Sequence, residues 1–201
     1  MRRKHEDNPG THAPEIILAS ASPRRSEILS RITDKFTTVT SNVVERAEGS
    51  PEEQALFLAE AKARAVAAEH PGVVIGADTI VVIDEHVLGK PGSREQARRM
   101  LEMLSGRAHD VLTGLCVLRT DRDTAQLWCE KTTVHFRDLS DREIDRYIDT
   151  EEYIDKAGGY AIQGYAAAFI SGIEGDYFNV MGLPLCRLVL LLREAGVDLL
   201  S

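Results

Sequence analysis

Apolar residues recur at helical spacing behind helix-start signals in several parts of the chain. Three helices are predicted behind a reciprocal capping pattern, in which a serine is followed three positions later by Glu or Gln. These pairs are Ser50–Glu53, Ser93–Gln96 and Ser140–Glu143. Two further helices are predicted over 23–32 and 184–196, each with a proline at its first turn, where the missing N–H costs nothing.

Between these helices lie apolar, β-branched runs that predict strands. The segment 73–83, VVIGADTIVVI, is almost continuously apolar, as expected of a central strand that is covered on both faces. Segments 111–120 and 127–136 flank a polar turn and predict an antiparallel pair. Shorter strands are expected over 15–20 and over 166–176. The alternation of helices and strands predicts an α/β fold with a mixed sheet.

Composition narrows the class of protein. Of 201 residues, 43% are hydrophobic and 28% are charged, which is typical of a folded globular chain. We expect a loose tail over 1–14 and a single domain over 15–201, in which two lobes could share a cleft. The net charge of −8 argues against a nucleic-acid polymer as partner, although a local basic pocket remains compatible with it. No apolar run is long enough for a membrane span, so no membrane partner is expected.

The three cysteines carry little functional signal. Cys116, Cys129 and Cys186 are widely spaced and form no Cys-x-x-Cys pair, which disfavours a zinc site or a redox dithiol. We interpret them as buried, reduced thiols of a cytoplasmic protein.

Two places in the first half of the chain concentrate polar groups near predicted strands. Ser20, Arg24 and Arg25 lie at a strand-to-helix turn, where guanidinium groups in the first helical turn suit a bound anion such as phosphate. Solvated surface arginines explain this turn equally well. Asp78 interrupts the apolar run 73–83, and a carboxylate there needs a partner or a metal unless it lies at an exposed strand end.

Three further polar residues remain ambiguous from the residues alone. Lys62 shares a helix face with apolar residues, where lysines usually extend their ammonium group to solvent. Lys90 sits on the stiff turn Gly-Lys-Pro-Gly, from which it could meet a phosphate or simply be solvated. Gln163 is surrounded by Gly158, Gly159 and Gly164, which suits either contact with a flat ligand edge or a flexible loop.

The order and wording of these segments resemble one known family. The following blocks occur in sequence: SASPRRSEIL, EAKARAVA, GADTIVV, LGKP, LSGRAHDVLTG, DKAGGYAIQG and GDYFNVMGLPL. Together they resemble the Maf family of nucleoside triphosphate pyrophosphatases, from about Ile16 to Leu192. The resemblance implies a mixed, twisted sheet flanked by helices, with two lobes around a central cleft, as in inosine-triphosphate pyrophosphatases.

The resemblance also implies a reaction and assigns roles to residues. Proteins similar to this one hydrolyse a nucleoside triphosphate to the monophosphate and pyrophosphate with a divalent metal, Mg²⁺ or Mn²⁺. The catalytic Asp of the family falls on Asp78, and its acidic partner, a second metal ligand, falls on Glu45. The expected phosphate-binding residues are Ser20, Arg24, Arg25, Lys62 and Lys90.

The subgroup of the family that acts on dTTP and UTP is matched at three specificity positions. These are Arg24, Thr79 and Gln163, so a pyrimidine triphosphate is the expected substrate. Two alternatives stay open: a pyrophosphatase for purine or modified nucleotides, and a non-catalytic regulator of cell division with the same fold. The resemblance is also compatible with a homodimer.

Overall fold

The chain forms a mixed seven-stranded sheet with helices on both faces. A computed structural model describes residues 14–200, so the tail predicted over 1–14 lies outside the described residues except for Pro14. The strand order is β2-β1-β3-β5-β6-β7, and β4 pairs with part of β3. The strands are β1 Ile16–Ala19, β2 Phe36–Thr38, β3 Val73–Ile83, β4 His86–Leu88, β5 Ala108–Arg119, β6 Thr124–Phe136 and β7 Ile170–Glu174.

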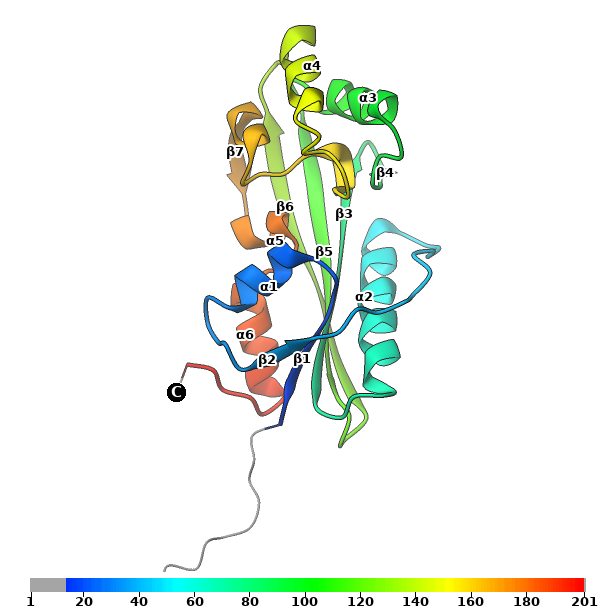
Figure 1. Ribbon diagram of the computed structural model, residues 1–201, viewed down its shortest axis with the longest axis vertical. Helices are drawn as coiled ribbons and strands as arrows, with labels where there is room; N and C mark the ends of the chain where they lie inside the picture. Colours follow the sequence, from blue (N-terminus) through cyan, green and yellow to red (C-terminus); the bar gives the residue numbers. More distant parts are fainter. Residues whose placement is uncertain (1–13, 201) are drawn as a thin grey trace, which may run out of the picture.

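The pairing of the strands changes from parallel to antiparallel at β3. Strands β2, β1 and β3 are parallel, whereas β3, β5, β6 and β7 pair antiparallel. The helices are α1 Pro23–Leu29, α2 Pro51–Ala67, α3 Arg94–Leu104, α4 Asp141–Asp149, α5 Tyr177–Met181 and α6 Leu185–Glu194, with 3₁₀ turns η1 Ala157–Gly159 and η2 Tyr165–Phe169. Figure 1 shows α2 on one side of the sheet and α1, α5 and α6 on the other, with α3 and α4 at the far end. This arrangement confirms the α/β class.

The strand predicted over 73–83 has these bounds in the structure. Most residues of β3 are buried, because α2 packs against one face and the main core packs against the other. Helix α2 approaches the sheet unusually closely at two glycines. A Cβ atom would lie 2.1 Å from the Ala59 carbonyl oxygen if added at Gly76, and 2.2 Å from that of Ala55 if added at Gly114. Backbone of α2 therefore rests directly on backbone of β3 and β5.

The predicted helix starts are largely confirmed. The side chain of Glu53 accepts a hydrogen bond from the backbone N–H of Ser50 at 2.7 Å, and Glu143 does the same for Ser140 at 2.9 Å. At Ser93 the hydroxyl accepts the N–H of Gln96, but the Gln96 side chain bonds Gly92 instead of returning to the cap. The serine caps thus form at three helices, and the reciprocal bond at two.

The expectation of one strand across 166–176 is wrong in its first half. Residues 165–169 form a 3₁₀ turn, and only Ile170–Glu174 pairs with β6. The run AAAF lacks the alternation of a half-buried strand, and Ala166 and Phe169 are buried at a spacing of three residues. The short strand β4 is a further element that the apolar pattern did not predict.

Candidate active site

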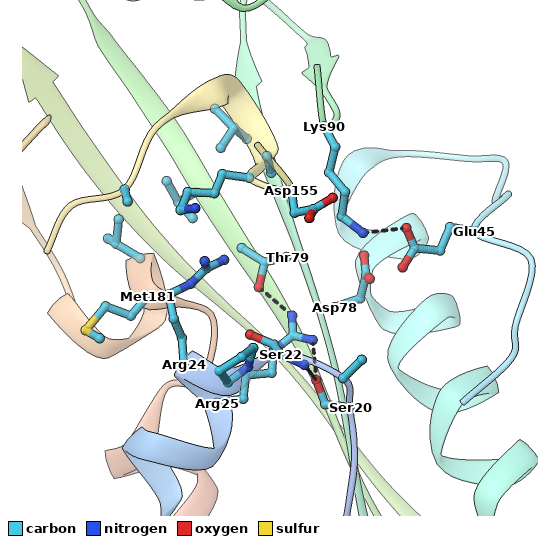
Figure 2. Close-up of a pocket in the computed structure, with 18 of the residues that line it drawn as sticks. Ser20, Ser22, Arg24, Arg25, Glu45, Asp78, Thr79, Lys90, Asp155 and Met181 are labelled. Carbon is cyan, nitrogen blue, oxygen red and sulfur yellow. Dashed lines mark hydrogen bonds and ion pairs between the residues drawn. The ribbon is translucent and has the colours of Figure 1, made fainter. Parts of the chain in front are cut away.

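A cleft of about 400 Å³ opens where the edge of β3 is uncovered. Strand β1 pairs with β3 only as far as Gly76, and β4 joins the same edge only from Val81. The residues between them therefore face a gap at the carboxyl end of β1, which is the usual place for a ligand in an α/β sheet. The volume suits a small molecule of nucleotide size. Figure 2 shows side chains from both sides of the sheet meeting in this gap.

Consecutive residues of β3 divide the cleft into two halves. Side chains of neighbouring strand residues point to opposite faces. Asp78 points towards α2, where it meets Lys62, and Thr79 points towards α1 and α5, where it meets Arg25. A ligand across this edge can therefore contact one chemistry on the Asp78 side and another on the Thr79 side.

On the Asp78 side, one buried lysine bridges two carboxylates. The Nζ atom of Lys62 donates to Asp78 Oδ1 at 2.6 Å and to Glu45 Oε1 at 2.7 Å. Both Lys62 and Asp78 are only 7% exposed, so neither group reaches solvent freely. Asp78 thus lies within the strand rather than at its exposed end, and Lys62 does not extend to solvent. Such buried charges need each other or a ligand.

Glu45 links this pair to a second lysine. Its other oxygen, Oε2, accepts a hydrogen bond from Lys90 Nζ at 3.0 Å, as Figure 2 shows. Partial burial alone would raise the pKa of Glu45, but hydrogen bonds and charge from Lys62 and Lys90 outweigh it and lower the pKa to about 2. Glu45 is therefore ionised at neutral pH, and the two lysines and two carboxylates form one charged cluster.

On the Thr79 side, Arg25 braces the cleft. Its guanidinium donates to the Gly182 carbonyl oxygen at 2.8 Å, to Ser20 Oγ at 3.2 Å and to Thr79 Oγ1 at 3.1 Å. Thr79 Oγ1 lies 2.9 Å from the hydroxyl of Thr113, which donates to the carbonyl oxygen of Asn179. These hydrogen bonds hold the Thr79 hydroxyl in a fixed position at the wall of the cleft. Burial lowers the pKa of Arg25, because loss of water around the guanidinium disfavours its charged form more than the charges of Asp78 and Glu45 favour it.

Arg24 and Lys156 place two cations on the same side, and neither forms an ion pair with a carboxylate of residues 14–200. Burial lowers the pKa of Arg24, and the charge of Asp155 raises it again only in part. The pKa of Lys156 is also lowered, first by burial and then by the charge of Arg24. Because each cation destabilises the other, an anion bound between them would be favoured. Figure 2 shows Asp155 above the cleft, between Arg24 and Lys90.

Apolar side chains form the remaining wall on this side. Val81, Val111, Tyr160 and Met181 line it, and Gln163 lies at its exposed rim. The ring of Tyr160 is held from behind, because its hydroxyl lies 2.8 Å from Nε2 of the buried His109. An apolar wall with one free amide at its edge suits a flat heterocycle.

The nine residues singled out from the sequence all line this one cleft. They are Ser20, Arg24, Arg25, Glu45, Lys62, Asp78, Thr79, Lys90 and Gln163. Their convergence is observed, whereas their individual roles stay predictions. Sequence reasoning missed Lys156, Tyr160 and Thr113; the first two stand in the glycine-rich block around Gln163, which is the only signal that could have found them.

Two features are absent from the described residues, a ready-made metal cage and a membrane-spanning helix. Within residues 14–200, no three His, Cys, Asp or Glu side chains come together as a ready-made metal cage. Asp78 and Glu45 contact the same Lys62 Nζ atom, and Asp155 is a third carboxylate that lines the cleft. Over the same residues, no helix combines the length and apolar character needed to cross a membrane.

Comparison with known proteins agrees with this geometry. The sequence model of the Maf-like protein family matches residues 15–195. A protein of Thermococcus gammatolerans named dTTP/UTP pyrophosphatase is 50% identical over 92% of this chain and 99% of its own. Proteins of the same name from Koribacter versatilis and Thermococcus onnurineus are 49% and 51% identical, each over 90% of this chain and 95% and 97% of their own. The family model covers most of the chain, and these relatives are about half identical to it over nearly its whole length. The charged cluster, the arginine turn and the Gln163 loop also meet in one cleft, and the chain belongs to the Maf-like protein family.

Proposed function

We propose that this chain is a nucleoside triphosphate pyrophosphatase that hydrolyses dTTP and UTP to the monophosphate and pyrophosphate. The observation that carries the proposal is the buried Lys62 bridging Asp78 and Glu45 beside further cations in a nucleotide-sized cleft. The printed names of relatives about half identical to this chain over nearly its whole length support the same substrates.

The charges of the cleft suit a triphosphate. Lys62, Lys90, Arg24 and Arg25 all line it although the chain as a whole carries a net charge of −8. Cleavage of a phosphoanhydride depends mainly on positioning and on neutralising the developing charge, which fixed cations do without reorganisation. Lys62 and Lys90 are proposed to contact the phosphates. Arg24 is proposed to lie where the phosphate-binding part of the cleft meets the part that binds the base.

In the proposed reaction, a water molecule attacks the α-phosphorus. Its oxygen forms the new bond, the bond from the α-phosphorus to the bridging oxygen breaks, and pyrophosphate leaves with that oxygen. Asp78 takes the proton of the attacking water, because it is the buried carboxylate of the cleft. Lys62 holds Asp78 in place through its hydrogen bond.

Asp78 and Glu45 would also hold the divalent metal that the family resemblance implies. Both carboxylates contact the same Nζ atom, so they lie close enough to share one ion, and two protein carboxylates suit Mg²⁺ or Mn²⁺, which keep water and phosphate oxygens as further ligands. When bound, the ion supplies charge neutralisation at the phosphates.

The Thr79 side is proposed to bind the base. Gln163 offers one acceptor and two donors, which complement the carbonyl and N3–H groups of uracil or thymine. Thr79 adds a hydroxyl fixed by Arg25 and Thr113. The apolar wall around Tyr160 would cover the face of the ring.

The test is a panel of nucleoside triphosphates assayed for pyrophosphate and for orthophosphate, with Mg²⁺ and with EDTA. We expect pyrophosphate from dTTP and UTP, little product from purine nucleotides, methylated purines included, and none with EDTA. Orthophosphate as the direct product would move the attack to the γ-phosphorus and refute the proposal. No product from any nucleotide would favour the non-catalytic regulator instead.

Asp78→Asn is the matching variant. It keeps the shape of the side chain but removes the proton acceptor, so kcat should fall by about 10²–10⁴-fold while circular dichroism shows an intact fold. Asp84→Asn, an exposed acid paired with Arg107 far from the cluster, serves as the control and should keep full activity. Wild-type turnover in Asp78→Asn would return Asp78 to a structural role.

Two further expectations accompany this function as proposals. A cytoplasmic location is supported by the free cysteines Cys116, Cys129 and Cys186, which form no disulfide among the described residues. Only Cys116 is buried, so the prediction of three buried thiols is wrong for the half-buried Cys129 and the exposed Cys186. The second expectation is a homodimer, which rests on the family resemblance. It can be tested separately from the proposed activity.

A further inference from the structure

The Gln163 side chain is exposed at the rim of the cleft, but the backbone around it is held in place. Gln163 belongs to the segment that connects α4 with β7 in Figure 1. The N–H of Gly164 donates to the carbonyl oxygen of Ala161 at 3.1 Å, which closes a turn around Gln163. The turn η2 follows directly, and its Phe169 side chain is buried in the core. The free amide therefore extends from a short segment that is anchored on its C-terminal side.

Glu152 binds the start of η2 with both oxygens of its carboxylate. Its Oε2 atom accepts a hydrogen bond from the backbone N–H of Tyr165 at 3.0 Å, and Oε1 accepts a longer one from the N–H of Ala166 at 3.5 Å. The first N–H groups of a helical turn have no partner within the turn, so an outside acceptor is needed. Hydrogen bonds to an ionised carboxylate are stronger than those between neutral groups. Glu152 thus fastens the two residues that follow the Gln163–Gly164 pair.

Gly164 allows this carboxylate to come close to Gln163. A Cβ atom added at Gly164 would lie 2.0 Å from Oε2 and 2.5 Å from Oε1 of Glu152, which is far closer than atoms can pack. The carboxylate therefore occupies the space that a side chain at residue 164 would fill. This contact gives Gly164 a role within the protein, next to the residue that is proposed to recognise the base.

Glu152 is itself fixed by the end of α4. Its N–H donates to Thr150 Oγ1 at 3.2 Å, and the Thr150 hydroxyl donates to the Tyr147 carbonyl oxygen at 2.6 Å. Tyr147 is buried, so this end of α4 is anchored in the core. The chain turns sharply between them, at Glu151, where φ is 60°. A carboxylate that is already held in place can fix a neighbouring segment precisely.

We propose that Glu152 is a positioning residue for base recognition, which holds the Gln163 amide where it meets the base and thereby sets the preference for pyrimidine over purine nucleotides. The inference rests on the proposed role of Gln163. Glu152 does not touch the substrate, because its two oxygens are used by backbone N–H groups. An amide carries donors on one side and an acceptor on the other, so it discriminates between bases only when its orientation is fixed.

Glu152 has a second possible route to the substrate, through its charge. The carboxylate raises the pKa of Lys156, although burial and the charge of Arg24 outweigh this and lower the pKa overall. Lys156 lines the cleft, so losing the charge of Glu152 through this route would change the binding of every nucleotide by a similar factor. The route through Gln163 predicts a larger loss for pyrimidine than for purine nucleotides. The two routes are therefore distinguished by selectivity.

Glu152→Gln tests the proposal against a matched control. The glutamine keeps the length of the side chain but has one acceptor oxygen and no charge, so it cannot accept from both Tyr165 and Ala166. We expect the ratio of kcat/KM for dTTP to that for GTP to fall by about tenfold. Glu151→Gln removes the same charge one residue earlier and should leave this ratio unchanged. Equal losses for dTTP and GTP in Glu152→Gln would overturn the proposal.

A double-variant cycle shows whether Glu152 acts through Gln163. In a chain that already carries Gln163→Ala, adding Glu152→Gln should leave the dTTP-to-GTP ratio unchanged, because the amide that Glu152 positions is gone. A general loss of structure would instead lower the ratio by the same factor in both backgrounds, and that result refutes a positioning role.

Gly164→Ala tests the same contact with Glu152 left in place. Its Cβ displaces the carboxylate, so the dTTP-to-GTP ratio should fall as it does in Glu152→Gln. This variant also keeps the proposal testable if Glu152→Gln does not fold. An unchanged ratio in Gly164→Ala would contradict the proposal.

NMR measurements on the ligand-free protein provide a readout that does not depend on activity. In Glu152→Gln, amide hydrogen exchange at Tyr165 should be about tenfold faster, and the backbone order parameter at Gln163 should fall from about 0.85 towards 0.6. Glu151→Gln should keep both values, and circular dichroism should show an intact fold in both variants. Unchanged exchange and order in Glu152→Gln would refute the role of Glu152 even if dTTP is hydrolysed. A loosened loop in a chain that hydrolyses no nucleotide would instead refute the proposed function, and with it the link from Glu152 to the base.

Discussion

Replacing Lys62 with methionine isolates the electrostatic role of the buried charge cluster. Methionine keeps the unbranched stem within α2 but removes the ammonium group. Asp78, whose side chain is 10% exposed, then loses a hydrogen bond of 2.6 Å and its buried counter-charge. Removing one partner of a buried ion pair typically costs about 3–5 kcal/mol, because the remaining charge is left uncompensated. Glu45 suffers less, since it keeps Lys90 and is 44% exposed.

Urea unfolding followed by circular dichroism measures this cost. We expect Lys62→Met to lower the free energy of unfolding by about 3–5 kcal/mol at an unchanged m-value, a large part of the 5–15 kcal/mol of a typical domain. The double variant Lys62→Met/Asp78→Asn should recover much of the loss, because a neutral amide replaces the stranded carboxylate. Both variants should be inactive.

Arg64→Met is the matched control for this experiment. Arg64 lies on the same helix and also forms an ion pair, with Glu60 at 2.7 Å, but it is exposed, so its removal should leave the unfolding curve unchanged. The reasoning is refuted if Lys62→Met stays within about 1 kcal/mol of wild type, or if the double variant is no more stable than the single one.

Three further predictions concern the Thr79 side of the cleft and the core behind it. Gln163→Ala should lower kcat/KM for dTTP by a factor equivalent to about 1–3 kcal/mol, and kcat/KM for purine nucleotides far less. Equal losses for all nucleotides would show that Gln163 does not recognise the base. Thr113→Val removes the hydroxyl behind Thr79 and should lower kcat/KM for dTTP, whereas Thr113→Ser should keep it; equal activities would show that the polar chain is dispensable. Burial lowers the pKa of His109 to about 4, so its neutral form stabilises the fold above pH 6.5, and about 3 kcal/mol is lost as the pH falls from 6.5 to 4. Urea unfolding of His109→Gln should show a flatter pH dependence over that range, and an identical one would contradict this assignment.

The sequence predicts elements well where a local signal acts alone. Capping serines and a continuous apolar run are such signals, and β3 and the starts of α2, α3 and α4 follow them. The segment 166–176 was mispredicted because a run of alanines carries no period, so its 3₁₀ turn depends on tertiary packing. Strand β4 is too short for a periodic pattern and follows the tight turn at Asp84 and Glu85, which both have positive φ.

The candidate site divides in the same way. Asp78 could be singled out from the residues because a carboxylate inside an apolar run is costly. Lys62 could not, since a lysine on a helix is usually solvated, and its burial becomes visible only when α2 is placed on the sheet. Thr113 carries no signal at all, because its contact with Thr79 joins residues on neighbouring strands whose register only the fold supplies.

The contact of α2 with the glycines of β3 and β5 bears on how the substrate range of such a cleft can change over evolution. Because helix backbone already touches sheet backbone there, no exchange of side chains can move the helix closer, and any side chain at Gly76 or Gly114 would push Lys62 away from Asp78. The position of α2, which forms the cleft wall beside the charge cluster, therefore cannot be changed gradually by single substitutions at this contact. The opposite wall consists of side chains and of the loop around Gln163, which can be lengthened or repacked without disturbing that helix. New base preferences are thus expected to arise by mutation on the Gln163 side, while the chemistry on the Asp78 side is inherited unchanged.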